Sequence, residues 1–310
     1  NVLCLVCVSK PRKSFGIFHC YERACIAQLI MRVSIKMELN EKTQVLIEAL
    51  PYFKKYNGKI VVIKFGGDTM SKIDCLIEDI VLLKHIGMKP VVVHGGGPEI
   101  DAELKKAGIT PKFINGLRYT DDKTIKIVDE VFKRVNKEIV NYISCHGAKA
   151  TNSSGCIKVK QKNPELGLVG EITKVEKGKI MKLVNAGFIP VISPLGIGND
   201  GKKYNINADT AASHIAVFLK AEKLTILTNV NGVIVNGNLI SHLDFGTAKK
   251  EIEKGTINKG MVPKVEACIH AVKNKCQKAH LLNGLIPHSL LLEIFTDKGV
   301  GTEIVYQNGN

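Results

Sequence analysis

Two apolar runs that end in glycine turns carry the first chemistry in this sequence. The run 60–65 places Lys64 beside Gly66 and Gly67, and the run 90–94 ends in the three glycines at 95–97. Glycine turns that lead into a helix present backbone N–H groups to an anion, and a lysine at the mouth adds a full positive charge. The spacing therefore predicts a cradle for a polyanion such as phosphate.

A second polar set lies in the carboxyl-terminal half of the chain. Asn205, Asn207 and Asp209 occupy alternate positions directly before a helix expected over 210–219. Side-chain capping of that helix explains Asp209 but not all three residues. Lys264 falls in the first turn of a later helix, where the helix dipole disfavours a lysine. We therefore expect these side chains to serve a site rather than a helix end.

The motifs of several nucleotide-binding families are missing. The sequence has no G-x-x-x-x-G-K-[ST] motif and no G-x-G-x-x-G motif after either strand, which removes the main support for P-loop and Rossmann folds. The lysine strand 62–64 and the Asp-Phe-Gly triplet 244–246 resemble protein-kinase motifs, but no H-R-D catalytic loop occurs. On the glycines alone, plain tight turns stay open as the alternative interpretation.

The elements that must position these residues follow from hydrophobic periodicity. Short runs rich in Val and Ile are typical of strands buried on both faces, as in a parallel sheet covered by helices. Residues 147–176 alternate and turn repeatedly, which predicts hairpins, and 196–201 is expected as a loop. We expect strands at 60–65, 90–94, 189–193, 223–229 and near 279–282, and helices at 40–55, 73–86, 98–108, 122–146, 210–219 and up to 273.

Composition limits the kinds of partner. The chain has 310 residues, 45% of them hydrophobic, which is enough for a large core in one domain or two lobes. Its formal charge of +15 would suit nucleic acid, but aromatic residues make up only 5% and no nucleic-acid-binding motif occurs. No run approaches the ~18 apolar residues of a membrane span. We therefore expect neither nucleic acid nor membrane as a partner, and interpret the spread positive charge as a solvated surface or as a sign of an anionic small-molecule substrate.

The nine cysteines have spacings that disfavour a metal site. Cys4-x-x-Cys7 has the spacing of half a zinc site, but Cys20-x4-Cys25 is too loose for the other half. The remaining cysteines, Cys75 among them, have no metal-ligand spacing. We therefore predict reduced thiols, no metal-ligating residues and a reducing compartment.

Residues 1–36 are basic and almost free of acidic residues. Such a composition is typical of an organelle transit peptide, although serine is scarce here. The alternative, slightly favoured, is that translation starts at Met37 and that the preceding residues are upstream or partial sequence. The predicted localisation is therefore cytoplasmic, with the plastid stroma as the alternative.

Five motifs follow one another in order along the chain. They are Lys64-Phe65-Gly66-Gly67, Val93-His94-Gly95-Gly96-Gly97, Asn115-Gly116-Leu117-Arg118-Tyr119-Thr120-Asp121, Tyr204-Asn205-Ile206-Asn207-Ala208-Asp209 and Gly260-Met261-Val262-Pro263-Lys264. Together they resemble the amino-acid kinase family, and within it the kinases of N-acetyl-L-glutamate, over about residues 40–306. The resemblance implies an α/β fold, a three-layer αβα sandwich with a mainly parallel open sheet. It also implies ATP-dependent phosphorylation of the γ-carboxylate of N-acetyl-L-glutamate in arginine biosynthesis, with ATP and Mg²⁺ as cofactors.

Carried over residue by residue, the resemblance implies roles by position. The catalytic residues would be Lys64, Lys264 and Asp209, with the aspartate holding both lysines in place. The lobes would be 58–195 for acetylglutamate and 196–310 for ATP and arginine, preceded by an extension at 1–36 and an oligomerisation helix at 37–57. Substrate contacts would come from Gly95, Gly96, Arg118 and Asn205, and ATP contacts from Gly66, Gly67, Asn207, Asn229, Gly260 and Met261.

The resemblance is to the arginine-sensitive type of this family. It implies feedback inhibition by arginine, a homo-oligomer expected as a hexamer joined through the helix 40–55, and a PII-type signalling protein as a candidate partner. The arginine pocket would comprise Tyr52, Lys54, Lys223, Glu293 and Gly299. The alternative is that the helix packs only on its own subunit and that Glu293 is a surface residue.

Two other classes of function stay open. Carbamate, aspartate and uridylate kinases belong to the same family, and a non-catalytic regulatory paralogue would keep the fold without turnover. The presence of both lysines and the aspartate of the expected catalytic set favours an active kinase. The departures from the family pattern are Asn229 in place of Asp, Lys259, Asp68 in the phosphate turn and a shortened hairpin at 152–155.

Overall fold

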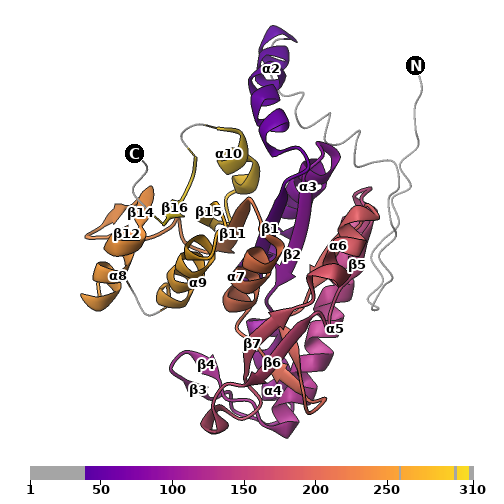
Figure 1. The fold of residues 1–310 in the computed structure, drawn as a ribbon, viewed down its shortest axis with the longest axis vertical. Coiled ribbons are helices and arrows are strands. Elements are labelled where there is room, and N and C mark those ends of the chain that lie inside the picture. The colour runs from indigo at the N-terminus through magenta and orange to yellow at the C-terminus, as the bar shows by residue number, and fades with distance from the viewer. Residues whose placement is uncertain (1–38, 258–259, 297–298, 307–310) are drawn as a thin grey trace, which may run out of the picture.

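An eight-stranded sheet forms the centre of the molecule (Figure 1). The computed structural model describes residues 39–257, 260–296 and 299–306. Neighbouring strands are parallel except β15 and β16, so the predicted mainly parallel open sheet is confirmed. Across the sheet the order is β14 (His242–Asp244), β16 (Thr302–Val305), β15 (Lys278–Asn283), β11 (Lys223–Thr228), β1 (Ile60–Phe65), β2 (Lys89–His94), β8 (Ile189–Ile192) and β5 (Ala150–Asn152).

Successive side chains of the central strands enter two separate cores. In β1, Val62 packs in one core while Val61 and Ile63 pack in the other, and all three are fully buried. Because neither face of the strand meets water, every position of β1 except Lys64 is apolar, and the strand has no alternating pattern. A sheet with two apolar faces needs a layer of helices on each.

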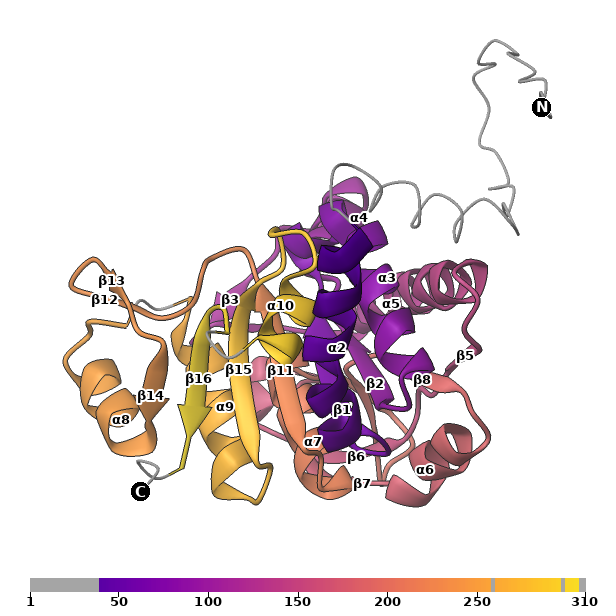
Figure 2. The same cartoon turned by 90° about the horizontal axis from the view of Figure 1, so that it is seen from above.

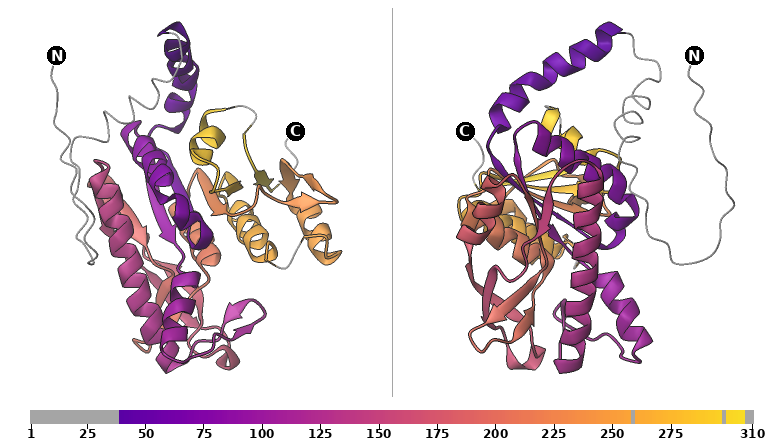
Figure 3. Two further views of the ribbon diagram at one scale, coloured as in Figure 1. Left: turned by 180° about the vertical axis from the view of Figure 1, so that it is seen from behind. Right: turned by 90° about the vertical axis from the view of Figure 1, so that its right-hand side faces the viewer.

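Helices cover both faces and give the three layers of an αβα sandwich (Figures 2 and 3). Within the described ranges, no helix combines the length and the apolar character needed to cross a membrane. One face carries α2 (Leu39–Tyr56), α3 (Ile73–His85), α4 (Gly97–Lys106), α5 (Asp122–Cys145) and α10 (Ser289–Phe295). The other carries α6 (Lys177–Asn185), α7 (Ala208–Leu219), α8 (Phe245–Glu253) and α9 (Val262–Lys273).

Helix α5 shows how closely the local sequence sets an element. Asp121 precedes it, and its side chain accepts hydrogen bonds from the backbone N–H groups of Lys123 and Thr124. The buried residues Val128, Phe132 and Val135 recur at helical spacing along one stripe. The prediction of a helix over 122–146 is therefore confirmed to within one residue.

A smaller sheet of four strands lies at the end of the molecule away from α2 (Figure 1). Its order is β10 (Lys203–Asn205), β9 (Leu195–Gly198), β6 (Ile157–Gln161) and β7 (Gly170–Val175). The prediction of hairpins over 147–176 is right for β6 and β7 but wrong for β5, which pairs with β8 in the main sheet. Strand β5 has three residues, which is too short to display a pattern. The loop expected at 196–201 is also wrong, because β9 and β10 pair as an antiparallel hairpin.

Short elements complete the described part of the chain. The turn between β3 and β4 runs through Asn115 and Gly116 with φ of 49° and 77°, the left-handed pair that a tight two-residue hairpin needs. These elements are the hairpins β3 (Phe113–Ile114) with β4 (Leu117–Arg118) and β12 (Ile234–Val235) with β13 (Asn238–Leu239), and the 3₁₀ helices η1 (Gly67–Lys72) and η2 (Pro164–Leu166).

Helix α2 projects from the rest of the molecule (Figures 1 and 3). It begins at Leu39, so Asn40 lies inside its first turn rather than capping it, and Pro51 lies within the helix as expected. Tyr52 packs edge-on against Phe295 of α10. By contrast, Leu46 is 65% exposed. The end of α2 is therefore fixed to its own subunit, while the middle presents apolar side chains to solvent.

Candidate active site

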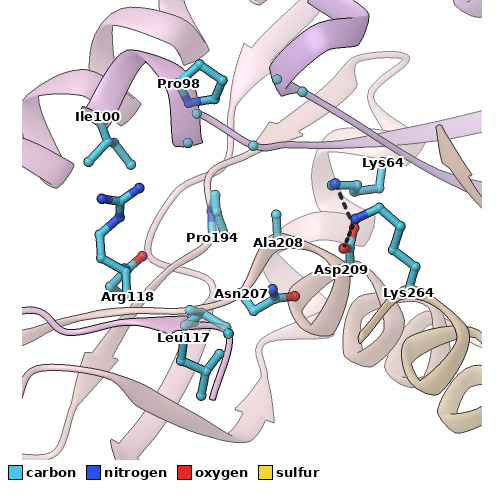
Figure 4. A pocket seen from close by; sticks show the side chains of 18 of the residues that line it. Lys64, Pro98, Ile100, Leu117, Arg118, Pro194, Asn207, Ala208, Asp209 and Lys264 are labelled. Carbon is cyan, nitrogen blue, oxygen red and sulfur yellow. Dashed lines mark hydrogen bonds and ion pairs between the residues drawn. The ribbon is translucent and has the colours of Figure 1, made fainter. Parts of the chain in front are cut away.

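A cavity of about 360 Å³ lies at the carboxyl ends of the neighbouring strands β11, β1, β2 and β8. The hairpin β3–β4 and the first turn of α7 complete its walls. Figure 4 shows Arg118 on one side of the cavity and Lys64, Asp209 and Lys264 gathered on the other. In open α/β sheets the loops at this edge converge, so it is the usual place for a ligand.

The two glycine turns press against each other in the cavity wall. Gly66 has φ of 152°, and a Cβ there would lie 2.6 Å from the backbone N of Gly95. The N–H of Gly95 donates to the carbonyl of Phe65 at 2.7 Å. Thr69 Oγ1 donates to Gly66 O at 3.0 Å and accepts from Gly66 N–H at 3.1 Å. Only glycine fits at position 66, so bare backbone lines this part of the cavity.

A buried histidine supports the second turn from behind. His94 Nδ1 lies 2.7 Å from Gly95 O, and Nε2 lies 3.2 Å from Asn136 Nδ2. A carbonyl oxygen only accepts, so the ring proton is on Nδ1, and Nε2 accepts from the amide. Burial lowers the pKa of His94 to about 4, which keeps the ring neutral at neutral pH. This histidine lies within the motif 93–97, but no local pattern in the sequence indicates its supporting role.

Two lysines from different elements share one buried aspartate. Lys64 Nζ lies 2.6 Å from Asp209 Oδ1, and Lys264 Nζ lies 3.2 Å from Asp209 Oδ2 (Figure 4). Lys64 stands on β1, Asp209 in the first turn of α7 and Lys264 in the first turn of α9. Two ammonium groups against one carboxylate leave a net positive charge on this wall of the cavity.

Asp209 stays ionised although it is 4% exposed. Burial by itself would raise the pKa of Asp209, but Lys64 and Lys264 outweigh burial and hold that pKa below its ordinary value. The cap of α7 is Asn207, whose Oδ1 accepts from Thr210 N–H at 3.0 Å. The expectation that Asp209 caps this helix is therefore wrong, because the helix begins at Ala208 and takes Asp209 into its first turn.

Arg118 lies across the cavity from the lysine pair. Its Nη1 donates to Asp101 Oδ1 at 2.5 Å, and its guanidinium stacks over the Phe113 ring at 4.8 Å from the centroid. Arg118 as a whole residue is 8% exposed. Asn205 lies on β10, where its Nδ2 donates to Thr120 Oγ1 at 3.3 Å. Sequence reasoning missed Asp101, because no local pattern links it to a residue 17 positions away.

The structure brings most of the sequence-predicted site residues to this cavity. Gly260 and Met261 are not among the described residues that line it, and the side chain of Met261, directly before α9, is buried in the core. Lys259 lies outside the described residues. The residues that line the cavity as predicted are Lys64, Gly66, Gly67, Gly95, Gly96, Arg118, Asn205, Asn207, Asp209, Asn229 and Lys264.

Known proteins share this sequence over most of its length. The Amino acid kinase family model matches residues 59–283. A curated acetylglutamate kinase from Caldanaerobacter subterraneus subsp. tengcongensis is 50% identical over 279 residues, which cover 85% of this chain and 93% of that protein. The chain belongs to the amino acid kinase family, among the acetylglutamate kinases. The matched range contains every residue of the first cavity.

Solved structures of N-acetylglutamate synthase from Neisseria gonorrhoeae have a similar fold. One, complexed with coenzyme A and N-acetyl-glutamate, has a TM-score of 0.80 at 25% identity over 86% of this chain. Another, complexed with coenzyme A and L-arginine, has a TM-score of 0.75. The chain spans 64% of the length of that synthase, so this amino acid kinase corresponds to a part of it.

This member of the family has a second cavity, of about 230 Å³, at the amino end of β11. It is lined by Tyr52, Lys223, Glu293 and Gly299, four of the residues predicted for arginine. Lys54 does not line it, and the neighbouring Lys55 does. Lys55 lies three residues after Tyr52 and shares its face of α2. Lys54 lies two residues after Tyr52, so it is on a different face of the helix.

Glu293 is the centre of this second cavity. Its Oε1 lies 2.9 Å from Lys223 Nζ and 2.7 Å from His280 Nε2, and its Oε2 accepts from Val300 N–H at 2.9 Å. Burial would raise the pKa of Glu293, but His280 and Lys223 outweigh it and bring that pKa to about 2. A Cβ on Gly299 would lie 2.8 Å from Glu293 Oε2. The Glu293 side chain is only 7% exposed, so it is not a surface carboxylate, and no local pattern in the sequence indicates its partner His280.

Proposed function

We propose that this chain transfers the γ-phosphoryl group of ATP to the γ-carboxylate of N-acetyl-L-glutamate, giving N-acetylglutamyl 5-phosphate in arginine biosynthesis. The observation that carries the proposal is the pair of lysines that share Asp209 beside two glycine turns. Phosphoryl transfer spreads negative charge over the moving oxygens, so it needs preorganised cations and N–H donors more than a protein nucleophile. The relative named acetylglutamate kinase supports this choice of substrate.

The first cavity fits the phosphates of ATP. The turn at Gly66 admits no Cβ, and Lys64 and Lys264 supply positive charge beside it. Mg²⁺ bound with ATP neutralises charge on the phosphate oxygens. Asp209 is the one carboxylate among the described lining residues, and it is held by two lysines. The phosphates, and not an acidic cage, would therefore hold the ion.

The reaction is a direct displacement at phosphorus. A γ-carboxylate oxygen of the substrate attacks the γ-phosphorus of ATP, the bond to the bridging oxygen breaks, and ADP leaves with that electron pair. Lys64 and Lys264 stabilise the charge on the moving group and the leaving group, and Asp209 positions both ammonium groups. No general base is needed, because the attacking carboxylate is ionised at neutral pH.

Arg118 and Asn205 supply the contacts that recognise the acylated amino acid. A guanidinium offers two parallel N–H donors to a carboxylate, and Asp101 holds that fork in the cavity wall. Asn205 has an amide that can pair with the acetamido group. We assign the amino-acid substrate to the lobe 58–195 and ATP to the lobe 196–310, with Asn205 contributing across the boundary.

The function is tested by measuring ADP release with a panel of acceptors. N-acetyl-L-glutamate should give the highest kcat/KM, ahead of aspartate, carbamate and UMP. A higher kcat/KM for one of the other three would move the chain to another branch of its family. No turnover with any acceptor would support a non-catalytic regulatory paralogue, in which Asn229 replaces the usual aspartate.

We also propose that arginine inhibits this kinase by binding in the second cavity. Glu293 and Glu303 offer carboxylates to a guanidinium or ammonium group, and Lys55, Lys223 and Lys278 offer cations to a carboxylate. The synthase bound to L-arginine supports the proposal, since its fold is similar. Turnover of the full chain should fall as arginine rises. Turnover that is independent of arginine would rule the regulation out.

The exposed apolar side chains of α2 favour a homo-oligomer, which we propose to be a hexamer. We also propose that the protein is cytoplasmic. Val45, Leu46 and Ile47 are each more than half exposed, and covering them against another copy removes apolar area from water. Light scattering should give a hexamer for the full chain and a smaller species for Leu46→Glu. A monomeric parent would contradict the proposal. A PII-type partner stays a prediction.

A further inference from the structure

Outside both cavities, one cluster brings together three different kinds of metal-binding donor. Among the residues that the structure describes, Cys75, Glu78 and His288 each offer one donor atom, and the three atoms all lie within 4.8 Å of one another. The cluster lies between α3 and α10, which pack in the same core side by side (Figures 1 and 2). All three residues are partly exposed, so an ion can reach them from solvent.

Helix α3 presents two of the donors on one face. Cys75 and Glu78 are three residues apart, so their side chains are neighbours on the helix surface. Asp79, four residues after Cys75, turns into the core and is 1% exposed. The third donor, His288, precedes α10 and has a left-handed backbone conformation, with a φ of 56°.

Asp79 fixes the ring of His288. His288 Nδ1–H donates to Asp79 Oδ1 at 2.6 Å. The other ring nitrogen, Nε2, lies 4.0 Å from Glu78 Oε2. A carboxylate behind the ring is the arrangement that sets the tautomer and direction of most metal-binding histidines. The buried Asp79 therefore orients the His288 ring and leaves Nε2 as the nitrogen available to a metal ion.

We propose that Cys75, Glu78 and His288 bind a divalent transition-metal ion, and that zinc is the ion their donors fit best. Thiolate, imidazole and carboxylate all bind Zn²⁺, whereas Mg²⁺ and Ca²⁺ prefer oxygen ligands alone. Neighbouring donors in a tetrahedral zinc site lie about 3.5 Å apart. The three donor atoms of the cluster lie within 4.8 Å of one another, so binding requires the partly exposed Cys75 and Glu78 side chains to move closer to His288. A fourth position stays open to water.

The ion joins two elements that serve different cavities. Helix α3 follows η1 and, before it, the turn at Gly66, while α10 carries Glu293. A ligand bound by both helices in the folded chain favours their native spacing and raises the free energy of unfolding. The site acts apart from the Mg²⁺ that accompanies ATP.

The test is a titration of the reduced, chelator-stripped full chain with Co²⁺, followed by displacement with Zn²⁺. Cobalt bound to a thiolate absorbs in the near-ultraviolet, and zinc should remove that band. Cys75→Ser and His288→Asn should each bind one equivalent of metal less than the parent, because each removes one ligand. Asparagine is chosen at position 288 because it tolerates the positive φ there. Asp79→Asn should weaken binding by about 10- to 100-fold.

The controls separate this cluster from other thiols and rings. The pair Cys4 and Cys7 lies outside the described residues and has half-site spacing. The proposed site is therefore reported by the difference in bound metal equivalents between the parent and His288→Asn. The total number of equivalents that the parent binds does not report it. Cys145→Ser at the exposed end of α5 and His85→Asn at the end of α3 should keep every equivalent. Unchanged turnover of each variant with N-acetyl-L-glutamate and ATP checks that it has folded.

Unchanged stoichiometry in Cys75→Ser and His288→Asn would overturn the proposal, as would an equal loss in the two controls. If Cys75→Ser does not fold, Glu78→Gln carries the same test, because its side chain is partly exposed and keeps its shape. Zinc should raise the Tm of the parent and leave that of Glu78→Gln unchanged. An equal rise in both would also overturn it.

Discussion

The two cavities at opposite ends of β11 are built from different parts of the chain. The first is walled by backbone, with glycine turns after β1 and β2 and the first turns of α7 and α9. The second is walled by long polar side chains, among them Lys223, His280 and Glu293. In the first, one carboxylate holds two lysines that keep a net positive charge. In the second, the buried ion pair is satisfied internally.

This difference sets how each cavity can respond to a ligand. The two glycine turns pack so closely that a Cβ on Gly66 would lie 2.6 Å from the backbone N of Gly95, so they have one arrangement. A fixed arrangement suits a site that must be ready for phosphate. Ion pairs between long side chains have several arrangements, and a ligand with charges of both signs can exchange partners with them. A ligand shifts a conformation only by binding one arrangement better than another. The second cavity is therefore the one suited to regulation.

The largest effect should come from the lysines of the first cavity. Lys64→Ala and Lys264→Ala should each lower kcat by about 100-fold or more, because one preorganised charge contact is lost. The KM values should change far less. Lys249→Ala, which removes an exposed surface lysine, should leave both constants unchanged. Near-normal kcat in either active-site variant would remove the distinction between the two cavities.

The second largest effect should follow from crowding the backbone of the first cavity. Gly66→Ala should lower kcat/KM for ATP by about 10-fold or more, since strain of this kind costs about 1–3 kcal/mol. Gly178→Ala on α6 is the control, because Gly178 does not line the cavity and a Cβ there meets nothing within 4 Å. Equal kinetics for the two variants would show that the contact between the turns is unimportant.

Arg118→Lys should have a smaller and more selective effect. Loss of one charged hydrogen bond costs about 1.5 kcal/mol, so KM for N-acetyl-L-glutamate should rise by about 10-fold. The KM for ATP should stay within twofold. A larger change in the ATP constant would place Arg118 in the wrong half of the first cavity.

The smallest effect should appear in the second cavity. Lys55→Ala should raise the arginine concentration for half inhibition by about 3-fold, because the charge of an exposed lysine contributes little. Lys54→Ala, one position away on α2 and outside the cavity, should change nothing. A larger shift for Lys54 than for Lys55 would restore the original prediction and contradict the observed face of α2.

The sequence predicts the first cavity well because its residues lie beside the breaks of strands and helices. A glycine after a buried strand, or a lysine in the first turn of a helix, marks its own position through local backbone physics. Lys64, Asp209 and Lys264 were all found this way, and the sheet brings them together. Local patterns cannot indicate hydrogen-bond partners that are far apart in the sequence. Examples are Asp101, which holds Arg118, and Asn136, which donates to His94.

The sequence predicts the second cavity less well because side chains from separate elements make it. The prediction of Lys54 is wrong and Lys55 lines the cavity instead, because the face that α2 turns to the cavity depends on its packing against α10. His280 was missed because a histidine within an apolar strand gives no local signal.

The central claim is that the first cavity makes an acyl phosphate, and trapping that product tests it most directly. Hydroxylamine converts an acyl phosphate to a hydroxamate, so the chain should form N-acetylglutamyl hydroxamate in step with ADP when given ATP, Mg²⁺ and N-acetyl-L-glutamate. Lys64→Ala should form both products together at about one hundredth of the rate. ADP release by the parent without hydroxamate would show that phosphate goes to water or elsewhere, and would contradict the account.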